Sequence, residues 1–93
     1  MCAFAVLFTS SAEREFRRLR HGLQARFSDA FAMLEVDPRR RRSGCDVRML
    51  SGVANAWRLR VGDYRGIYAI EGGDIVLTRF GHRRSVYGWT NAA

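Results

Sequence analysis

The sequence predicts a single α+β domain over residues 1–93, an antiparallel β-sheet of element order β-α-α-β-β-β with a helical hairpin packed on one face. Two periodicities support this prediction. Apolar residues recur every three to four positions from residue 10 to residue 34, as in amphipathic helices, and they alternate with polar residues from residue 57 onward, as in strands. The length supports one core and no second domain.

The first half of the chain predicts a strand followed by two helices. The continuous apolar run from Cys2 to Phe8 has strand length and is too short for a signal peptide or a membrane span. Ser10 followed by Glu13 is a capping-box pattern that opens a helix, Gly22 interrupts it, and the second helix ends before Pro38. The helical positions expected in the core are Ala12, Phe16, Leu19, Leu23, Phe27, Ala30, Phe31 and Leu34.

The second half predicts an exposed loop, a short anchor and three strands. Residues 39–44 carry an arginine run without apolar partners, which is typical of a loop. The apolar residues of segment 47–50 predict an anchor to the core. Strands are expected over 57–61, 64–70 and 74–80, because Gly62-Asp63 and Gly72-Gly73 are two-residue hairpin turns.

These turns fix the register of the three strands and therefore the face that each side chain occupies. Val61 should oppose Tyr64 and Arg60 should oppose Arg65, while Ile70 opposes Ile75 across the second turn. The face toward the helices then collects Trp57, Leu59, Val61, Tyr64, Tyr68, Ile70, Ile75 and Leu77. The opposite, uncovered face collects Arg58, Arg60, Arg65, Ile67, Thr78, Phe80 and His82.

The charge of the chain predicts a polyanionic partner. The formal net charge is +7, and all 16 basic residues are arginine. A GC-rich genome explains the lack of lysine but not the excess of positive charge, which attracts nucleic acid or an acidic protein. Like charges opposite each other in a sheet cost about 0.2–1 kcal/mol per pair. The facing pair Arg60 and Arg65 is therefore either screened by solvent or built to hold an anion, a role that suits the planar guanidinium group.

Other site chemistries find less support in the sequence. Cys2 and Cys45 lack metal-ligand spacing and are expected to be reduced thiols of a cytoplasmic protein. Neither a metal nor another cofactor is expected, and no membrane partner is expected. Phe80, His82 and Tyr87 follow the arginine strands and could stack on bases of single-stranded RNA.

The segment WRLRVGDYRGIYAIEGGDIVLTRFGHRRSVY, residues 57–87, resembles the RelE/ParE toxin superfamily. The shared pattern is a basic strand, Gly-Asp-Tyr-Arg, an aliphatic strand, Gly-His-Arg and a nearby tyrosine. The resemblance is strong over residues 47–87 and limited to element order over residues 1–46. It implies a toxin of a type II toxin–antitoxin system, with a cognate antitoxin as protein partner and mRNA on the ribosome as substrate. The Gly-His-Arg ending resembles the RelE branch, whose members cleave mRNA and inhibit translation. The alternative is a ParE-like inhibitor of DNA gyrase without nuclease activity.

The resemblance also implies roles for residues at matching positions. Arg58 and Arg60 match the basic pair, Arg65 the phosphate-binding arginine, Arg83 the leaving-group arginine and Tyr87 the terminal tyrosine. The neighbouring Arg84 is expected to contact RNA, as are Arg58, Arg60 and Phe80. Family members often carry lysine at positions 58 and 60, and arginine cannot accept a proton as a general base. That task is left to His82, Tyr87 or water. Strand alternation places Arg83 on the wrong face, so a β-bulge near Gly81 is assumed to turn it.

The implied reaction is a metal-independent cleavage in which the RNA 2′-oxygen attacks phosphorus and the 5′-oxygen leaves. The products are a 2′,3′-cyclic phosphate and a 5′-hydroxyl. Arg60 and Arg65 are expected to clamp the phosphoryl oxygens, Arg83 to stabilise the leaving oxygen and Tyr87 to orient the nucleophile. His82 is a candidate acid or base, because its ordinary pKa lies near neutrality.

Overall fold

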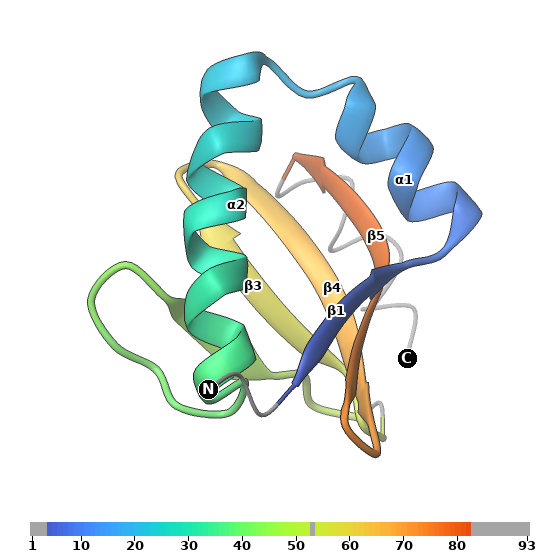
Figure 1. Cartoon of the computed structure of the whole chain (residues 1–93), viewed down its shortest axis with the longest axis vertical. Coiled ribbons are helices and arrows are strands. Elements are labelled where there is room, and N and C mark those ends of the chain that lie inside the picture. Colours follow the sequence, from blue (N-terminus) through green and yellow to red (C-terminus); the bar gives the residue numbers. More distant parts are fainter. Residues whose placement is uncertain (1–3, 53, 83–93) are drawn as a thin grey trace.

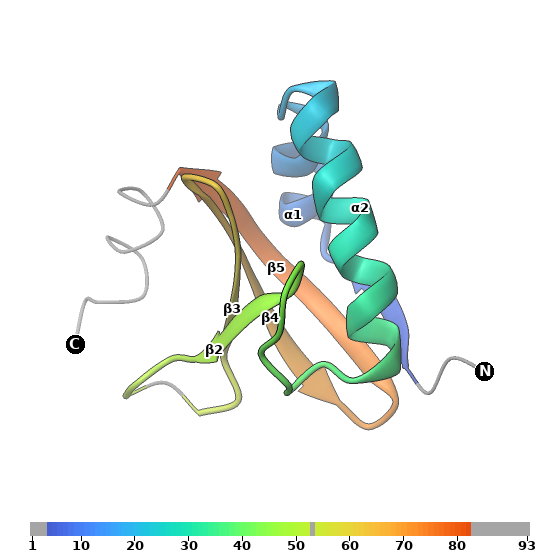
Figure 2. The same ribbon diagram turned by 90° about the vertical axis from the view of Figure 1, so that its left-hand side faces the viewer.

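The computed structural model describes residues 4–52 and 54–82, which form a five-stranded sheet with two helices on one face (Figures 1 and 2). The predicted α+β class is confirmed. In chain order the elements are β1 (Ala5–Phe8), α1 (Ser10–Arg17), α2 (His21–Val36), β2 (Asp46–Met49), β3 (Trp57–Val61), β4 (Tyr64–Glu71) and β5 (Asp74–His82). No helix in the described ranges has the length and apolar character needed to cross a membrane.

The sheet differs from the expected one in two respects. Its strand order is β1-β5-β4-β3-β2, and β1 runs parallel to β5 while the other neighbours are antiparallel, so the sheet is mixed. The segment expected to be only an anchor is a full strand, β2, in which buried Val47 pairs with Leu59. Alternation of Val47 and Met49 with Asp46 and Arg48 is the strand period, which is hard to recognise over four residues.

The helices begin and end close to the predicted positions. Thr9, not Ser10, is the N-cap of α1, and its hydroxyl accepts a hydrogen bond from the Ala12 amide at 3.1 Å. At the other end of the helical layer, the guanidinium of Arg42 donates to the carbonyl oxygens of Met33 at 2.6 Å and Asp37 at 3.1 Å. The Met33 carbonyl also accepts the backbone amide of Asp37, so Arg42 adds a second donor there and ties the following loop to the end of α2.

The core lies between the helices and the sheet and is rich in phenylalanine. The ring of Phe80 lies 5.2 Å from that of Phe16, 5.2 Å from that of Phe27 and stacks at 5.8 Å on that of Phe8. Deeper along the sheet, the Tyr68 hydroxyl donates to the Pro38 carbonyl at 2.6 Å. Burial raises the pKa of Tyr68 and also that of the Cys45 thiol, so both groups stay protonated at neutral pH. All the helical positions predicted for the core are buried or packed against it.

The predicted strand register is confirmed up to one point in β5. Val61 pairs with Tyr64, Arg60 with Arg65 and Ile70 with Ile75. The register then shifts, because Tyr68 pairs with Leu77 while Ile67 pairs with Arg79. Thr78 is therefore an extra residue in β5, and this β-bulge reverses the faces of the residues that follow it.

Candidate nucleic-acid interface

Two guanidinium groups converge at the turn between β3 and β4. Arg60 and Arg65 lie directly opposite each other on the sheet face turned away from the helices. Arg60 Nε donates to the carbonyl oxygen of Gly62 at 3.3 Å, and Arg65 Nη1 donates to the same oxygen at 3.2 Å. Gly62 has a φ of 60°, which the two-residue hairpin turn requires. The predicted cross-strand pair is thus a pair of cations that share one acceptor oxygen.

The register places Arg58, Arg60 and Arg65 on one face of the sheet as predicted, but the prediction that they are uncovered is wrong for two of them. Of these three arginines only Arg60 is exposed, since Arg65 is 4% and Arg58 8% exposed. Arg58 also has a carboxylate partner, Asp46 of β2, at 3.5 Å. This ion pair is not predictable without β2, because only the pairing of β2 with β3 brings Asp46 next to Arg58. Arg58 Nε is a buried donor without a hydrogen-bond partner among the described residues, which is uncommon for a buried polar atom.

The β-bulge at Thr78 corrects the predicted positions of Phe80 and His82. Phe80 was expected beside the arginines, but it is 2% exposed and lies in the core, where it cannot stack on a base. His82 pairs with Tyr64 and shares its face, and the two rings meet edge to face with centroids 5.5 Å apart. The sheet therefore separates His82 from the guanidinium groups of Arg60 and Arg65, and the predicted grouping of His82 with them is wrong.

Three predicted site residues, Arg83, Arg84 and Tyr87, lie outside the described residues. The bulge that was assumed near Gly81 is present three residues earlier in β5. It places Gly81, rather than Phe80, opposite Arg65.

Arg26 of α2 is a further site residue, beyond those predicted from the sequence. Its Nη1 atom lies 3.7 Å from the position that a β-carbon at Gly62 would take, so its guanidinium reaches the β3–β4 turn from the helix side. A groove between this turn and the first turns of α2 is lined by Arg20, Leu23, Arg26, Tyr64 and His82, among others. The helical period predicts an exposed position for Arg26, but only the packing of α2 over the sheet places it beside the turn.

The described part of the site can bind an anion, and its arginines cannot remove a proton. Guanidinium groups offer several fixed N–H donors, which suit the oxygens of a phosphodiester. Within residues 4–52 and 54–82, no group of three histidine, cysteine or acidic side chains could hold a metal ion.

Comparison with known proteins places the chain in a family. The family of ParE toxins of the type II toxin–antitoxin system parDE matches residues 6–87. No protein of curated function matches the chain.

Several solved structures have a similar fold. RelE–RelB of Pyrococcus horikoshii is similar with 26% identity and a TM-score of 0.75, over 87% of this chain and 96% of that chain. RelB–RelE of Methanococcus jannaschii has 22% identity and a TM-score of 0.75, over 89% and 96% of the two chains. A mutant of Escherichia coli RelE in the free state has 18% identity and a TM-score of 0.75, over 98% and 96%. The family match covers most of the sequence, and the chain therefore belongs to the ParE toxin family of type II toxin–antitoxin systems, within the RelE/ParE superfamily.

Proposed function

We propose that this toxin is an endoribonuclease of the RelE type, which cleaves mRNA on the ribosome and so inhibits translation. The observation that carries the proposal is the convergence of Arg60 and Arg65 on one oxygen atom, at 3.3 and 3.2 Å. Two cations from neighbouring strands can hold the non-bridging oxygens of a single phosphodiester in the same way, because each guanidinium keeps further N–H donors for a second acceptor.

The reaction uses the RNA as its own nucleophile. The 2′-oxygen loses its proton and bonds to phosphorus, the bond from phosphorus to the 5′-oxygen breaks, and the 5′-oxygen takes up a proton. The products are a 2′,3′-cyclic phosphate and a 5′-hydroxyl. Arg60 and Arg65 stabilise the negative charge that develops on the phosphoryl oxygens in the transition state.

The remaining roles come from the resemblance of the sequence ending to the superfamily. Arg83 stabilises the leaving 5′-oxygen, Arg84 contacts the RNA backbone, and Tyr87 orients the 2′-hydroxyl. Proton removal falls to Tyr87 or to water, since His82 faces the other side of the sheet. Arg58 is buried beside its carboxylate partner Asp46, so it adds positive charge near the bound RNA rather than an exposed donor.

The proposed protein partner is a cognate antitoxin, as in the RelE–RelB complexes of similar fold. An acidic segment of such a protein would neutralise the exposed arginines and block access of RNA to the β3–β4 turn. The toxin then acts in the cytoplasm, where ribosomes and mRNA are available.

A second candidate function is inhibition of DNA gyrase, as in ParE-like toxins. The observation that favours it is the family match itself, which is to ParE toxins over residues 6–87. Such a toxin binds a protein and needs no guanidinium pair on a single oxygen.

The experiment compares mRNA cleavage in a translating extract for the wild type, Arg65→Ala and Arg60→Ala. We expect cleavage to fall by about 10²–10³-fold in each variant, since each removes a donor to the developing charge. Arg39→Ala is the control, because Arg39 is an exposed residue at the opposite end of α2. Arg65 is buried, so circular dichroism must show that its variant is folded, while exposed Arg60 supplies a second test.

Cleavage of mRNA at the wild-type rate by both variants would refute the proposed binding of the phosphodiester by Arg60 and Arg65. A wild type that leaves mRNA intact but inhibits purified DNA gyrase would replace the nuclease proposal with the second candidate.

A further inference from the structure

We infer that the groove on the helix side of the β3–β4 turn binds the stretch of single-stranded RNA next to the cleaved phosphodiester. We call it the turn groove and define it by Arg20, Leu23, Arg26, Tyr64 and His82. The inference rests on the proposed function and extends it, because it adds a second binding region on the face of the sheet opposite Arg65.

Charge is the first feature that fits a polynucleotide. Arg20 and Arg26 are exposed and have no ion-pair partner among the described residues, and Asp63 is the one carboxylate that lines the turn groove in the described chain. Arg20 is also the N-cap of α2 without a side-chain cap hydrogen bond, and the first turn of that helix carries no acidic residue. The helix dipole therefore adds to the positive potential of the arginines.

An aromatic surface is the second feature. Tyr64 is partly exposed in the turn groove and meets the His82 ring edge to face at 5.5 Å, an arrangement that holds the tyrosine ring in place. Sites for single-stranded nucleic acid combine a cationic groove for phosphates with aromatic rings on which bases stack. An acidic peptide would use the arginines but has no need of an open aromatic ring.

Continuity is the third feature, and it links the turn groove to the proposed cleavage site. A neighbouring depression lined by Arg60 shares Arg26 and Gly62 with the turn groove. On the other side, a depression lined by Arg18 shares Arg20 and Tyr64 with it. Arginines thus recur along a continuous path from Arg60 around the turn to the α1–α2 connection. Carboxylates also line the two outer depressions: Asp29 and Asp46 in the first and Glu15 in the second, where Asp46 and Glu15 already pair with other arginines.

The three features together define a path for the RNA strand over the surface. The β3–β4 turn projects at the same end of the molecule as the α1–α2 connection and the end of β5 (Figure 1). A strand held by Arg60 and Arg65 at one phosphate passes over Gly62, and the next phosphates meet Arg26 and Arg20. Gly62 lacks a side chain at the crossing, which leaves the backbone open to the RNA.

The test measures binding of 2′-O-methyl oligoribonucleotides of three and nine residues by fluorescence anisotropy at several salt concentrations. These probes lack the attacking hydroxyl, so binding is measured without cleavage. We expect the R20A/R26A variant to bind the nine-residue probe about tenfold or more weakly and the three-residue probe as the wild type does. The slope of log Kd against log salt should fall by about 0.7 for each lost phosphate contact.

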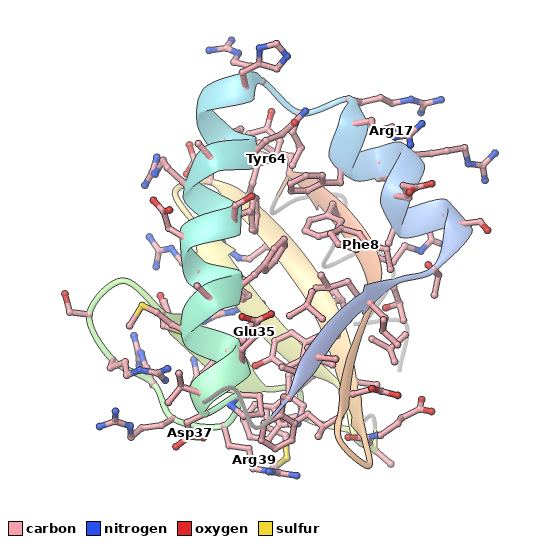
Figure 3. All side chains as sticks on the ribbon, viewed as in Figure 1. Phe8, Arg17, Glu35, Asp37, Arg39 and Tyr64 are labelled. Carbon is pink, nitrogen blue, oxygen red and sulfur yellow. The ribbon has the colours of Figure 1, made fainter. Side chains whose placement is uncertain are left out.

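The matched control is R39A/R40A, which removes two positive charges at the far end of α2 (Figure 3). Equal weakening by the control and by R20A/R26A would assign the effect to net charge and overturn the inference. So would equal weakening for both probe lengths, equally tight binding of duplex RNA, or displacement of the long probe by polyglutamate at equal charge concentration.

Failure of the inference can be told apart from failure of the proposed function. If R20A/R26A binds the long probe normally while Arg60→Ala abolishes mRNA cleavage, the nuclease stands and the turn groove does not. If the wild type binds the probes as expected but cleaves no mRNA, the turn groove stands as an RNA-binding site and the nuclease proposal falls.

Discussion

Arginine residues lie at both ends of α2 but differ in their contacts. At its C-terminal end, the arginine run is tied to the fold: Arg40 pairs with Asp37 at 3.8 Å, and Arg41 pairs with Asp46 at 3.0 Å. Arg42 goes further and caps the helix through backbone carbonyl oxygens. These contacts lie at the end of the molecule that Figure 3 marks with Asp37 and Arg39.

At the N-terminal end of α2, the arginines have no such partners. Arg20, Arg26 and Arg60 are exposed and form no ion pair within the described residues, although they line adjoining grooves around one turn. Positive charges that lie close together and are not ion-paired repel one another, and an anionic ligand relieves the repulsion. The densest arginine run in the sequence therefore contributes to the fold, while arginines that are dispersed in the sequence form the candidate interface.

The largest expected effect comes from reversing one charge at each end. Arg60→Glu should lower mRNA cleavage by about 10²–10³-fold, because it removes a donor to the phosphoryl oxygens and places a carboxylate beside them. Arg40→Glu changes the net charge equally and should leave the rate within about twofold. Initial rates in a translating extract measure both. Equal losses would mean that overall charge, not position, drives activity.

For the free energy of unfolding, a substitution at the C-terminal end of α2 should have the larger effect. Arg42→Ala removes hydrogen bonds to the end of α2 and should lower the free energy of unfolding by about 1.5–3 kcal/mol, the range for bonds made by charged groups. Arg26→Ala removes an exposed side chain and should change it by no more than about 0.5 kcal/mol. Urea denaturation followed by circular dichroism measures both variants. A larger loss in Arg26→Ala would make Arg26 a structural residue and weaken the contrast between the two ends.

Asp46 links the arginine run to the sheet, because its carboxylate contacts Arg41 of the loop and Arg58 of β3. Asp46→Asn should destabilise the fold by about 1–2 kcal/mol, since buried Arg58 loses its counter-ion, although partial exposure of Asp46 softens the loss. A double-mutant cycle with Arg58→Met separates the pair from other effects. A coupling energy near zero would show that Arg58 does not depend on Asp46 and is available to a ligand.

These contrasts show what local sequence could and could not predict. The turn pairs Gly62-Asp63 and Gly72-Gly73 set the register of β3, β4 and the first part of β5, because short-range backbone geometry decides it. The bulge at Thr78 has no such local signal. It depends on how β5 fits between β1, β4 and α1, where Glu15 accepts a hydrogen bond from the Phe80 amide at 3.0 Å.

The same limit applies to the candidate site. Pairing of Arg60 with Arg65 followed from the turn, but the partners of Arg58 and the approach of Arg26 depend on segments distant in sequence. The burial of Phe80, in contrast, could have been predicted from its residue type. A large aromatic residue favours burial, and that preference conflicted with the uncovered face to which strict alternation assigned it.

The smallest expected effect is that of removing the exposed ion pair between Arg40 and Asp37. Arg40 and Asp37 are largely exposed and their charged atoms lie 3.8 Å apart, so solvent and salt screen the pair. Arg40→Ala should therefore lower the free energy of unfolding by about 0–0.5 kcal/mol and leave RNA binding unchanged. Urea denaturation at low and high salt measures the first, and the anisotropy assay measures the second. A loss of RNA binding here would extend the interface along the whole of α2, because it would show that an arginine with a carboxylate partner can still serve the nucleic acid.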